Sequence, residues 1–373
     1  MDDLSASLRA SPELFPFAFE AERDRVHFLR LSRADYASAS FLDERILAAS
    51  PRAQRAIGWS DVVAATSAMP ERLDYIFHIG HVGSTLLSRL LGSDPRILPL
   101  REPAILRILA LLRAQAAAPP ARWTEDDFTR RLSGFLKLWS RTFAEDERVI
   151  LKATSFASVL APELLLRDNH SRAVLMYAAP ESYLASILGA PNSPMEAKAL
   201  APMRLGRLER TVGQSLPPIS SMSAGEVVAM SWASEMTSLL RARQAAADRA
   251  MLLDFDAFLA SPRDLLAVCF RHFDFDVSEE ALGAIVGGPL MRQYSKAPEH
   301  AYDADLRRAV QDDGRRLFAP EIRHGLAWLE RMGKEHSGIA VALETRTRPS
   351  AIDAGAPVNA RKPTSYYGNR RKP

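Results

Sequence analysis

An apolar run that meets a two-glycine turn and then a row of helically spaced leucines constrains this chain more than any other feature. The run covers residues 75–79, the turn is Gly80-His-Val-Gly-Ser-Thr85, and the leucines occupy positions 86, 87, 90 and 91. Glycines permit a tight turn with exposed N–H groups, and a helix N-terminus adds partial positive charge. The stretch therefore predicts a strand, an anion-binding loop and a helix. A plain tight turn between strand and helix is the alternative.

Short apolar segments alternate with amphipathic ones along the rest of the chain. Strands are expected at residues 25–31, 97–100, 148–152, 173–177 and 250–254. Helices are expected at residues 104–118, after Thr124, after the capping box Ser223–Glu226, from Ser261-Pro262 and from Pro320. This alternation predicts an α/β fold with an open, mostly parallel sheet flanked by helices, in which ligands bind at the carboxyl ends of the strands.

We divide the 373 residues into an N-terminal cap segment (1–70), a P-loop domain (71–335) and a basic tail (346–373). The tail carries seven basic residues and one acid, a net charge of +6, so the rest of a chain of net charge +3 sums to −3. A tail of this composition is expected to be disordered and solvated, with a contact to RNA or acidic lipid as the alternative.

Several classes of protein are not expected. A single cysteine, Cys269, rules out a disulfide framework. No N-terminal signal peptide and no run approaching about 18 apolar residues is present, which predicts a cytoplasmic protein without a membrane span. The slightly acidic body does not indicate nucleic-acid binding. No metal site is expected, since the eight histidines lack ligand spacing, and no Gly-x-Ser-x-Gly elbow occurs.

The glycine turn departs from the Walker A motif, because Gly83 rather than Lys precedes Ser84. The segment 81–85, His-Val-Gly-Ser-Thr, resembles instead the 5′-phosphosulfate loop of PAPS-dependent sulfotransferases, with His81 where that family carries Lys or Arg. The form His-x-Gly-x-x-Gly-Ser-Thr-Leu-Leu looks closest to bacterial sulfotransferase-like proteins. The resemblance covers about residues 74–303.

A second motif of the family is only partly present. In sulfotransferases a strand ends in Arg-Asp-Pro, a Ser follows on the next helix, and the Arg and Ser hold the 3′-phosphate of the donor. Pro180 and Ser186 match, but Ala178 and Ala179 replace the Arg and Asp. A guanidinium on a phosphate contributes a strong charge-assisted bond, so another cation is needed there. Residues 294–303 lie where the family places a loop over the donor, and Arg292 and Lys296 are candidates within or beside it.

The resemblance implies transfer of a sulfuryl group from PAPS to a hydroxyl or amine of a small molecule or peptide, without a metal. Glu102 would be the general base, protonated His81 would support the leaving group, and Lys152 would stabilise the transferring group. The donor contacts implied are Gly80, His81, Val82, Gly83, Ser84, Thr85, Ser186, Arg292 and Lys296. The alternatives are a surface Glu102 paired with Arg101 and a Lys152 that is an ordinary edge residue.

Two other functions remain open. A P-loop phosphotransferase would explain Ala178 and would require ATP and Mg²⁺, but it would lack the Walker lysine. A non-catalytic nucleotide-binding protein on a sulfotransferase scaffold would explain both Ala178 and His81. Residues 190–222 are expected to line the acceptor pocket, although they do not name the acceptor. A homodimer is compatible with the sequence, which does not fix the oligomeric state.

Overall fold

The computed structural model describes residues 2–49, 53–115, 123–297, 299–301, 303–345 and 352–353. Its central sheet has the strand order β5 (Ile97–Arg101), β6 (Arg148–Lys152), β4 (Leu73–His78), β7 (Ala173–Tyr177), β8 (Ala250–Asp254) and β9 (Ile352–Asp353). The first five strands run parallel and β9 is antiparallel to β8. The α/β fold is therefore confirmed, and the predicted strands at 148–152, 173–177 and 250–254 agree with the structure.

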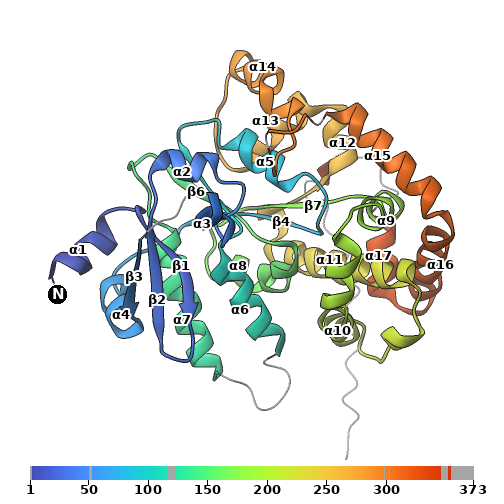
Figure 1. Cartoon of the computed structure of the whole chain (residues 1–373), viewed down its shortest axis with the longest axis horizontal. Coiled ribbons are helices and arrows are strands. Elements are labelled where there is room, and N and C mark those ends of the chain that lie inside the picture. Colours follow the sequence, from blue (N-terminus) through green and yellow to red (C-terminus); the bar gives the residue numbers. More distant parts are fainter. Residues whose placement is uncertain are drawn as a thin grey trace, which may run out of the picture.

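Helices cover both faces of this sheet, which explains why β4 and β7 are buried along their whole length. Figure 1 shows α5 (Ser84–Leu91) and α13 (Pro262–His272) on one face. On the other face lie α6 (Ala104–Gln115), η1 (Ser155–Leu160), α8 (Ala161–Leu166) and α11 (Ala224–Ala246). Because helices occupy both faces, the carboxyl ends of the strands form the edge of the sheet at which side chains from several elements can meet.

The residues before the glycine turn form a second sheet. It is antiparallel, with β1 (Leu14–Glu20), β2 (Arg25–Arg30) and β3 (Gln54–Gly58), and is accompanied by α1 (Asp2–Ala10), α2 (Arg33–Ser38), α3 (Arg45–Ala49) and α4 (Trp59–Thr66). Of its strands the sequence predicted only β2. Buried Arg101 attaches this part to the main sheet, because its guanidinium donates to the carbonyls of Tyr36 and Ala39 at 3.0 and 2.7 Å.

The predicted helix starts at Thr124 and Ser223 agree with the structure. Thr124 caps α7 (Glu125–Trp139) and Ser223 caps α11, each in a reciprocal capping box. The other helices are α9 (Pro180–Leu188), α10 (Ser193–Val212), α12 (Phe255–Ala260), α14 (Glu279–Gly287), α15 (Ala304–Leu317), α16 (Ala319–Glu335) and α17 (Ser337–Glu344), with short 3₁₀ turns η2 (Ile219–Ser221), η3 (Ala247–Arg249) and η4 (Pro289–Arg292).

Helices α11 and α16 cross with their backbones in contact. A Cβ on Gly225 would lie 1.8 Å from the carbonyl oxygen of Glu321, and one on Gly325 would lie 2.6 Å from the carbonyl oxygen of Gly225. Only glycine permits so close an approach. This crossing fixes α11 against one face of the sheet. The middle turns of α11 lie at the carboxyl ends of the strands.

The predicted basic tail lies outside the described residues, except for Ile352 and Asp353, which pair with Leu253 and Leu252 of β8. Among the residues that the structure describes, no helix combines the length and apolar character that a membrane span requires. The boundaries of the three predicted parts of the chain stay predictions.

Candidate active site

The glycine turn places a row of unbonded N–H groups at the carboxyl end of β4. Gly80, His81 and Gly83 have φ angles of 96, 55 and 62°, in the left-handed region. This conformation turns the backbone so that the N–H groups of residues 81–85 donate no hydrogen bond to any described residue. Gly83, the N-cap of α5, supplies no side-chain cap to the helix either. Successive free N–H groups at a helix N-terminus form a concave anion site.

The hydroxyl groups that follow the turn are enclosed. Ser84 and Thr85 are both buried, and the Thr85 Oγ1 atom has no hydrogen-bond partner among the described residues. A buried hydroxyl without a partner is costly, so it is usually matched by a bound group or an ordered water. The loop and these two hydroxyls together fit a phosphate or sulfate group.

A side chain at position 83 would collide with the ring of Phe255. A Cβ on Gly83 would lie 2.0 Å from the ring of Phe255, the first residue of α12. The ring of Phe255 therefore covers the Cα of Gly83, and the role of the Gly83 N–H toward a donor stays a prediction. Arg307 of α15 also packs on that ring, with its Cζ 4.5 Å from the centroid, and is paired with Asp256 at 2.9 Å.

His81 contacts α10 and is neutral in the ligand-free protein. Its Nε2 lies 2.9 Å from the Oγ of Ser193, the first residue of α10. Burial lowers the pKa of His81 to about 4, and the charges of Lys296 and Arg307 act in the same direction. The role of a protonated His81 toward a bound donor stays a prediction. A bound dianion would raise this pKa, because it stabilises the protonated form.

Glu102 and Lys152 form an ion pair beside the loop. Arg101 and Lys152 are register partners at the ends of β5 and β6, which brings the next residue, Glu102, against Lys152. The fully buried Lys152 ammonium contacts the Glu102 carboxylate, and the N–H of Glu102 donates to the Lys152 carbonyl at 2.7 Å. The alternative pairing of Glu102 with Arg101 is wrong, since the Arg101 guanidinium points toward the N-terminal part.

This ion pair has an unusual electrostatic setting. Burial lowers the pKa of the Lys152 ammonium to about 8, while the Glu102 carboxylate opposes that shift. The Lys152 Nζ lies 5.6 Å from the ring centroid of Phe41, so a residue of the N-terminal part forms one wall. Glu102 has a φ angle of 52°, a strained value for a glutamate. Such strain at a half-buried carboxylate is typical of functional sites, because the surroundings must hold it in place.

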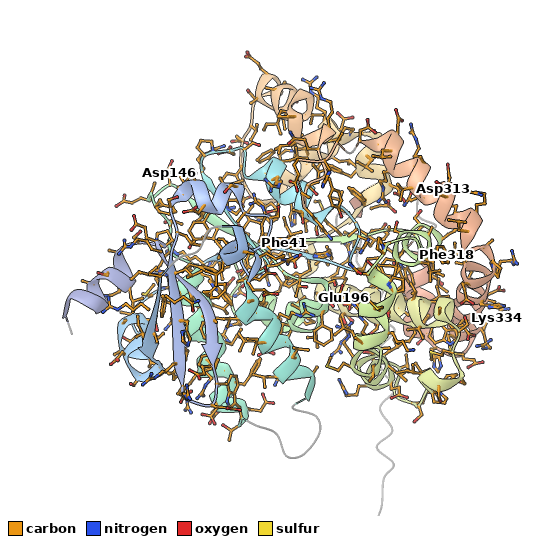
Figure 2. The ribbon with its side chains drawn as sticks, in the orientation of Figure 1. Phe41, Asp146, Glu196, Asp313, Phe318 and Lys334 are labelled. Atoms are coloured by element: carbon orange, nitrogen blue, oxygen red, sulfur yellow. The ribbon has the colours of Figure 1, made fainter. Side chains whose placement is uncertain are left out.

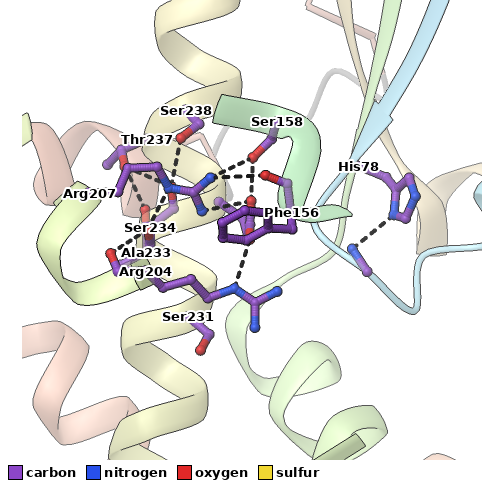
Figure 3. Close-up of polar contacts among 12 residues, drawn as sticks. His78, Phe156, Ser158, Arg204, Arg207, Ser231, Ala233, Ser234, Thr237 and Ser238 are labelled. Atoms are coloured by element: carbon purple, nitrogen blue, oxygen red, sulfur yellow. Dashed lines mark hydrogen bonds and ion pairs between the residues drawn. The ribbon is translucent and has the colours of Figure 1, made fainter. Parts of the chain in front are cut away.

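His78 connects the ion pair to the loop. Its Nδ1 accepts a hydrogen bond from the N–H of Gly80 at 3.0 Å (Figure 3). Its Nε2 lies 2.9 Å from the carbonyl oxygen of Ala153 and 4.0 Å from Glu102. A carbonyl only accepts, so Nε2 carries the proton and the imidazole is neutral. Burial holds the pKa of His78 well below its usual value. We predicted no role for His78, although a histidine that ends an apolar strand before a glycine turn was a usable signal.

The loop after α14 brings Lys296 toward the same edge. Gln293 and Ala301 form an isolated bridge, and the carbonyl of Ser295 accepts from Arg89 of α5 at 2.9 Å. These contacts hold the exposed Lys296 where its charge lowers the pKa of His78, His81 and Lys152. The segment thus contributes a cation to the site.

Two predicted donor contacts make no hydrogen bond to the glycine loop among the described residues. Arg292 is exposed and donates to the carbonyl of Gly287 at 2.9 Å. Ser186 on α9 accepts from the Nε2 of Gln311 at 3.2 Å, on the same helix as Arg307 and one turn beyond it. Their roles toward a donor stay predictions. Sequence reasoning did not find Phe255, Arg307 or Ser193, because only the tertiary fold brings them to the loop.

No group of three or more His, Cys, Asp or Glu side chains suited to a metal ion occurs among the described residues. No protein-family model matches the chain, and no curated protein matches it.

The chain is similar to three solved structures at low identity. The sulfotransferase domain of the curacin biosynthetic pathway is 14% identical, with a TM-score of 0.38 over 66% of this chain and 90% of that one. The sulfotransferase domain of the Synechococcus PCC 7002 olefin synthase is 17% identical, with a TM-score of 0.36 over 66% and 88%. A sulfotransferase from Alicyclobacillus acidocaldarius is 13% identical, with a TM-score of 0.33 over 69% and 95%.

Proposed function

We propose that the protein is a sulfotransferase that moves a sulfuryl group from PAPS to a hydroxyl or amine acceptor. The observation that carries this proposal is the juxtaposition of an anion-binding loop with a buried carboxylate–ammonium pair at one edge of the sheet. The loop offers free N–H groups at residues 81–85, and Glu102 lies 4.0 Å from His78, whose other ring nitrogen holds the loop at Gly80. A binding protein would need the loop but not the pair.

The loop residues would hold the 5′-phosphosulfate of PAPS, which supplies the sulfuryl group. Their N–H groups, with the hydroxyls of Ser84 and Thr85, would stabilise charge that develops on the leaving phosphate. Lys296 would add a positive charge from the loop above. Positioning and charge stabilisation are expected to dominate such a displacement, as in phosphoryl transfer.

Glu102 would serve as the general base. Its carboxylate would take the proton of the acceptor hydroxyl while the acceptor oxygen bonds to sulfur and the bond from sulfur to the donor phosphate breaks, releasing 3′-phosphoadenosine 5′-phosphate (PAP). Lys152 would hold the carboxylate in place, since its own ammonium is fully buried and faces Glu102. A general base acts in its ionised form, and the ion pair places the Lys152 ammonium against that carboxylate.

The 3′-phosphate of the donor would be held by residues outside the degraded second motif. Ala178 offers no cation, and the indole of Trp232 donates to its carbonyl at 3.0 Å. Arg307 and Gln311 lie four residues apart on α15, so they share one face of that helix, and Gln311 contacts Ser186. We propose that Arg307, with Ser186, replaces the missing arginine.

A transfer assay tests the proposed function directly. The full chain is incubated with ³⁵S-labelled PAPS and a panel of phenols, aliphatic alcohols and amines in buffer containing EDTA. We expect labelled product with at least one acceptor class, and loss of that product in Glu102→Gln. Hydrolysis of ATP that requires Mg²⁺, with no transfer from PAPS, would favour a phosphotransferase. Binding of PAP without any transfer would favour a non-catalytic nucleotide-binding protein.

A further inference from the structure

A buried group of charged residues lies between α10, α11 and η1, and no step of the proposed reaction uses it. Glu235 of α11 is fully buried and pairs with two arginines of α10, with Arg204 Nε at 2.8 Å and Arg207 Nη2 at 2.8 Å (Figure 3). The hydroxyl of Ser158 also donates to the Glu235 carboxylate. All the members are less than one-tenth exposed. We call these four residues the Arg204 cluster.

The charges of the Arg204 cluster do not balance. Two guanidiniums face one carboxylate, which leaves one positive charge in the interior. Burial of an unpaired charge is expensive, and proteins normally pair it or bind an ion there. The two acids of α10, Glu196 and Glu209, make no ion pair with either arginine among the described residues, although the charge of exposed Glu196 acts on Arg204. Figure 2 shows Glu196 near the middle of the view.

The two arginines use their nitrogens differently. Each nitrogen of the Arg207 guanidinium has a polar neighbour. Its Nε donates to the Ser234 hydroxyl at 2.9 Å and its Nη1 to the Ser158 hydroxyl at 3.1 Å, while its Nη2 forms the ion pair with Glu235 without a hydrogen bond of good geometry. Arg204 donates only from Nε, and neither of its terminal nitrogens has a hydrogen bond within the described residues. In Figure 3 no dashed line reaches that end of the guanidinium. An Arg204 that is 4% exposed therefore presents a free planar fork.

The cluster lies close to the candidate active site. The 3₁₀ turn η1 begins at Ser155, whose Oγ is 3.6 Å from the place that a Cβ on Gly80 would take. Ser158, three residues after Ser155, belongs to the Arg204 cluster. Because a 3₁₀ helix rises about 2 Å per residue, Ser155 and Ser158 are separated by roughly 6 Å along the helix axis. Helix α10, which carries Arg204, begins at the residue that contacts His81. Figure 3 shows the cluster and His78 in one view.

A second polar group is found beside Arg204. Tyr183 of α9 is buried, and its hydroxyl makes no hydrogen bond within the described part of the chain. Burial raises the pKa of this hydroxyl to about 12, while the charge of Arg204 lowers it, so the two side chains are near one another. A guanidinium fork and a free phenol hydroxyl can both donate to one carboxylate.

We propose that Arg204 binds a carboxylate of the acceptor, so that the acceptors are hydroxy or amino compounds that carry a carboxylic acid. This inference rests on the proposed function. A monoanion matches the single uncompensated charge, and a planar carboxylate matches the two parallel N–H groups of the fork. Tyr183 would donate to the same carboxylate. The acid group would thereby orient the acceptor with its hydroxyl or amine toward Glu102.

Matched pairs of acceptors test the proposal. Each pair is a hydroxy acid and its primary amide, for example 4-hydroxyphenylacetate and 4-hydroxyphenylacetamide, or 3-hydroxybutyrate and 3-hydroxybutyramide. Transfer from ³⁵S-labelled PAPS is measured for the full chain, and binding of the same compounds to the chain saturated with PAP is measured by calorimetry. We expect the acid of each accepted pair to be preferred at least 10-fold, in transfer and in binding.

Two variants assign that preference to Arg204. Arg204→Gln removes the excess charge but leaves Glu235 paired with Arg207, so it should fold, and it should lose the preference for the acid. Arg204→Lys keeps the positive charge but lacks the planar guanidinium fork, so it should keep only part of the preference for the acid. Arg210→Gln, at an exposed position on the same helix, is the control and should behave like the wild type.

The outcomes separate the two proposals. The carboxylate proposal is overturned if the wild type uses acid and amide equally, or if no pair shows acid-selective binding. It is also overturned if Arg204→Gln keeps the full preference for the acid over the amide. Acid-selective binding that Arg204→Gln abolishes, without transfer to any acceptor, supports the Arg204 site and contradicts the proposed function alone.

Discussion

Glu102 and Lys152 are joined twice, through the backbone and through their side chains. The N–H of Glu102 donates to the carbonyl of Lys152 at 2.7 Å, and the Lys152 ammonium binds the Glu102 carboxylate. The parallel register of β5 and β6 produces both contacts, since Arg101 pairs with Lys152 and the chain then turns at Glu102 with a φ angle of 52°. The fold thus holds an acid and a base beside the glycine loop.

Replacement of Glu102 by glutamine should lower turnover by about 10²–10⁴-fold, the usual contribution of a general base, and leave PAP affinity within about twofold of the wild type. Transfer kinetics and calorimetry measure the two effects. Glu44→Gln, at an exposed position in the N-terminal part, is the control. Near-normal turnover in Glu102→Gln, or a large loss of PAP affinity, would make Glu102 a structural partner of Lys152.

Turnover should fall as the pH rises through about 8, where Lys152 loses its proton. In the unfolded chain Lys152 keeps its proton up to its ordinary pKa of 10.5. Between pH 8 and pH 10.5 the unfolded state therefore binds more protons than the folded state, so this group makes the stability of the fold rise with pH. Activity should therefore decline without unfolding. In Lys152→Arg the charge persists, and the decline near pH 8 should disappear. A descending limb unchanged in that variant would assign it to another group.

Gly83→Val should abolish PAP binding and lower the melting temperature. The new side chain overlaps the ring of Phe255 at a backbone φ of 62°, so either the loop or α12 must move. Gly213→Val is a matched control, because Gly213 has a φ of 78° but open space around its Cβ position. Calorimetry and thermal denaturation follow both variants. Unchanged PAP affinity in Gly83→Val would show that the loop is only a turn.

Arg307→Gln should reduce the preference for PAP over adenosine 5′-monophosphate, which lacks the 3′-phosphate. A charge-assisted bond to phosphate is worth about 1.5–3 kcal/mol, so a loss of preference of at least 10-fold is expected. Arg308→Gln, its exposed neighbour, should keep the wild-type ratio. Equal losses of affinity for both nucleotides would place Arg307 at the 5′-phosphate instead.

Truncation after Thr345 should leave the fold intact. It removes the basic tail and the two-residue strand β9, whose only described strand partner is β8. Thermal denaturation should show a shift of a few degrees at most, since one short pairing contributes little beside the core of the central sheet. A loss of cooperative unfolding would mean that the tail is an integral part of the domain.

The central sheet was predictable because its strands are short apolar runs bounded by polar residues and turns. β1 and β3 were not predicted, since β1 contains Pro16 and three of the five residues of β3 are exposed. The attachment of the N-terminal part to the main sheet involves buried Arg101, whose backbone partners are more than 60 residues away. Nothing local in the sequence indicates such contacts.

Some features of the candidate site could likewise be predicted from the sequence, and others could not. The glycine loop was predicted from local turn chemistry, and Glu102 and Lys152 were predicted as separate strand-end residues. Their pairing, the neutral state of His81 and the ring of Phe255 over Gly83 depend on register, burial and packing, which appear only in the fold.

The central claim is that the glycine loop binds the phosphate end of a sulfuryl donor without a metal. Calorimetric titration of the full chain with PAP in EDTA, and then with ATP in the presence and absence of Mg²⁺, tests it most directly. The account predicts saturable, 1:1 binding of PAP in EDTA that Gly83→Val abolishes, with weaker binding of ATP that Mg²⁺ does not improve. Tight binding of ATP that depends on Mg²⁺, together with no binding of PAP, would contradict it.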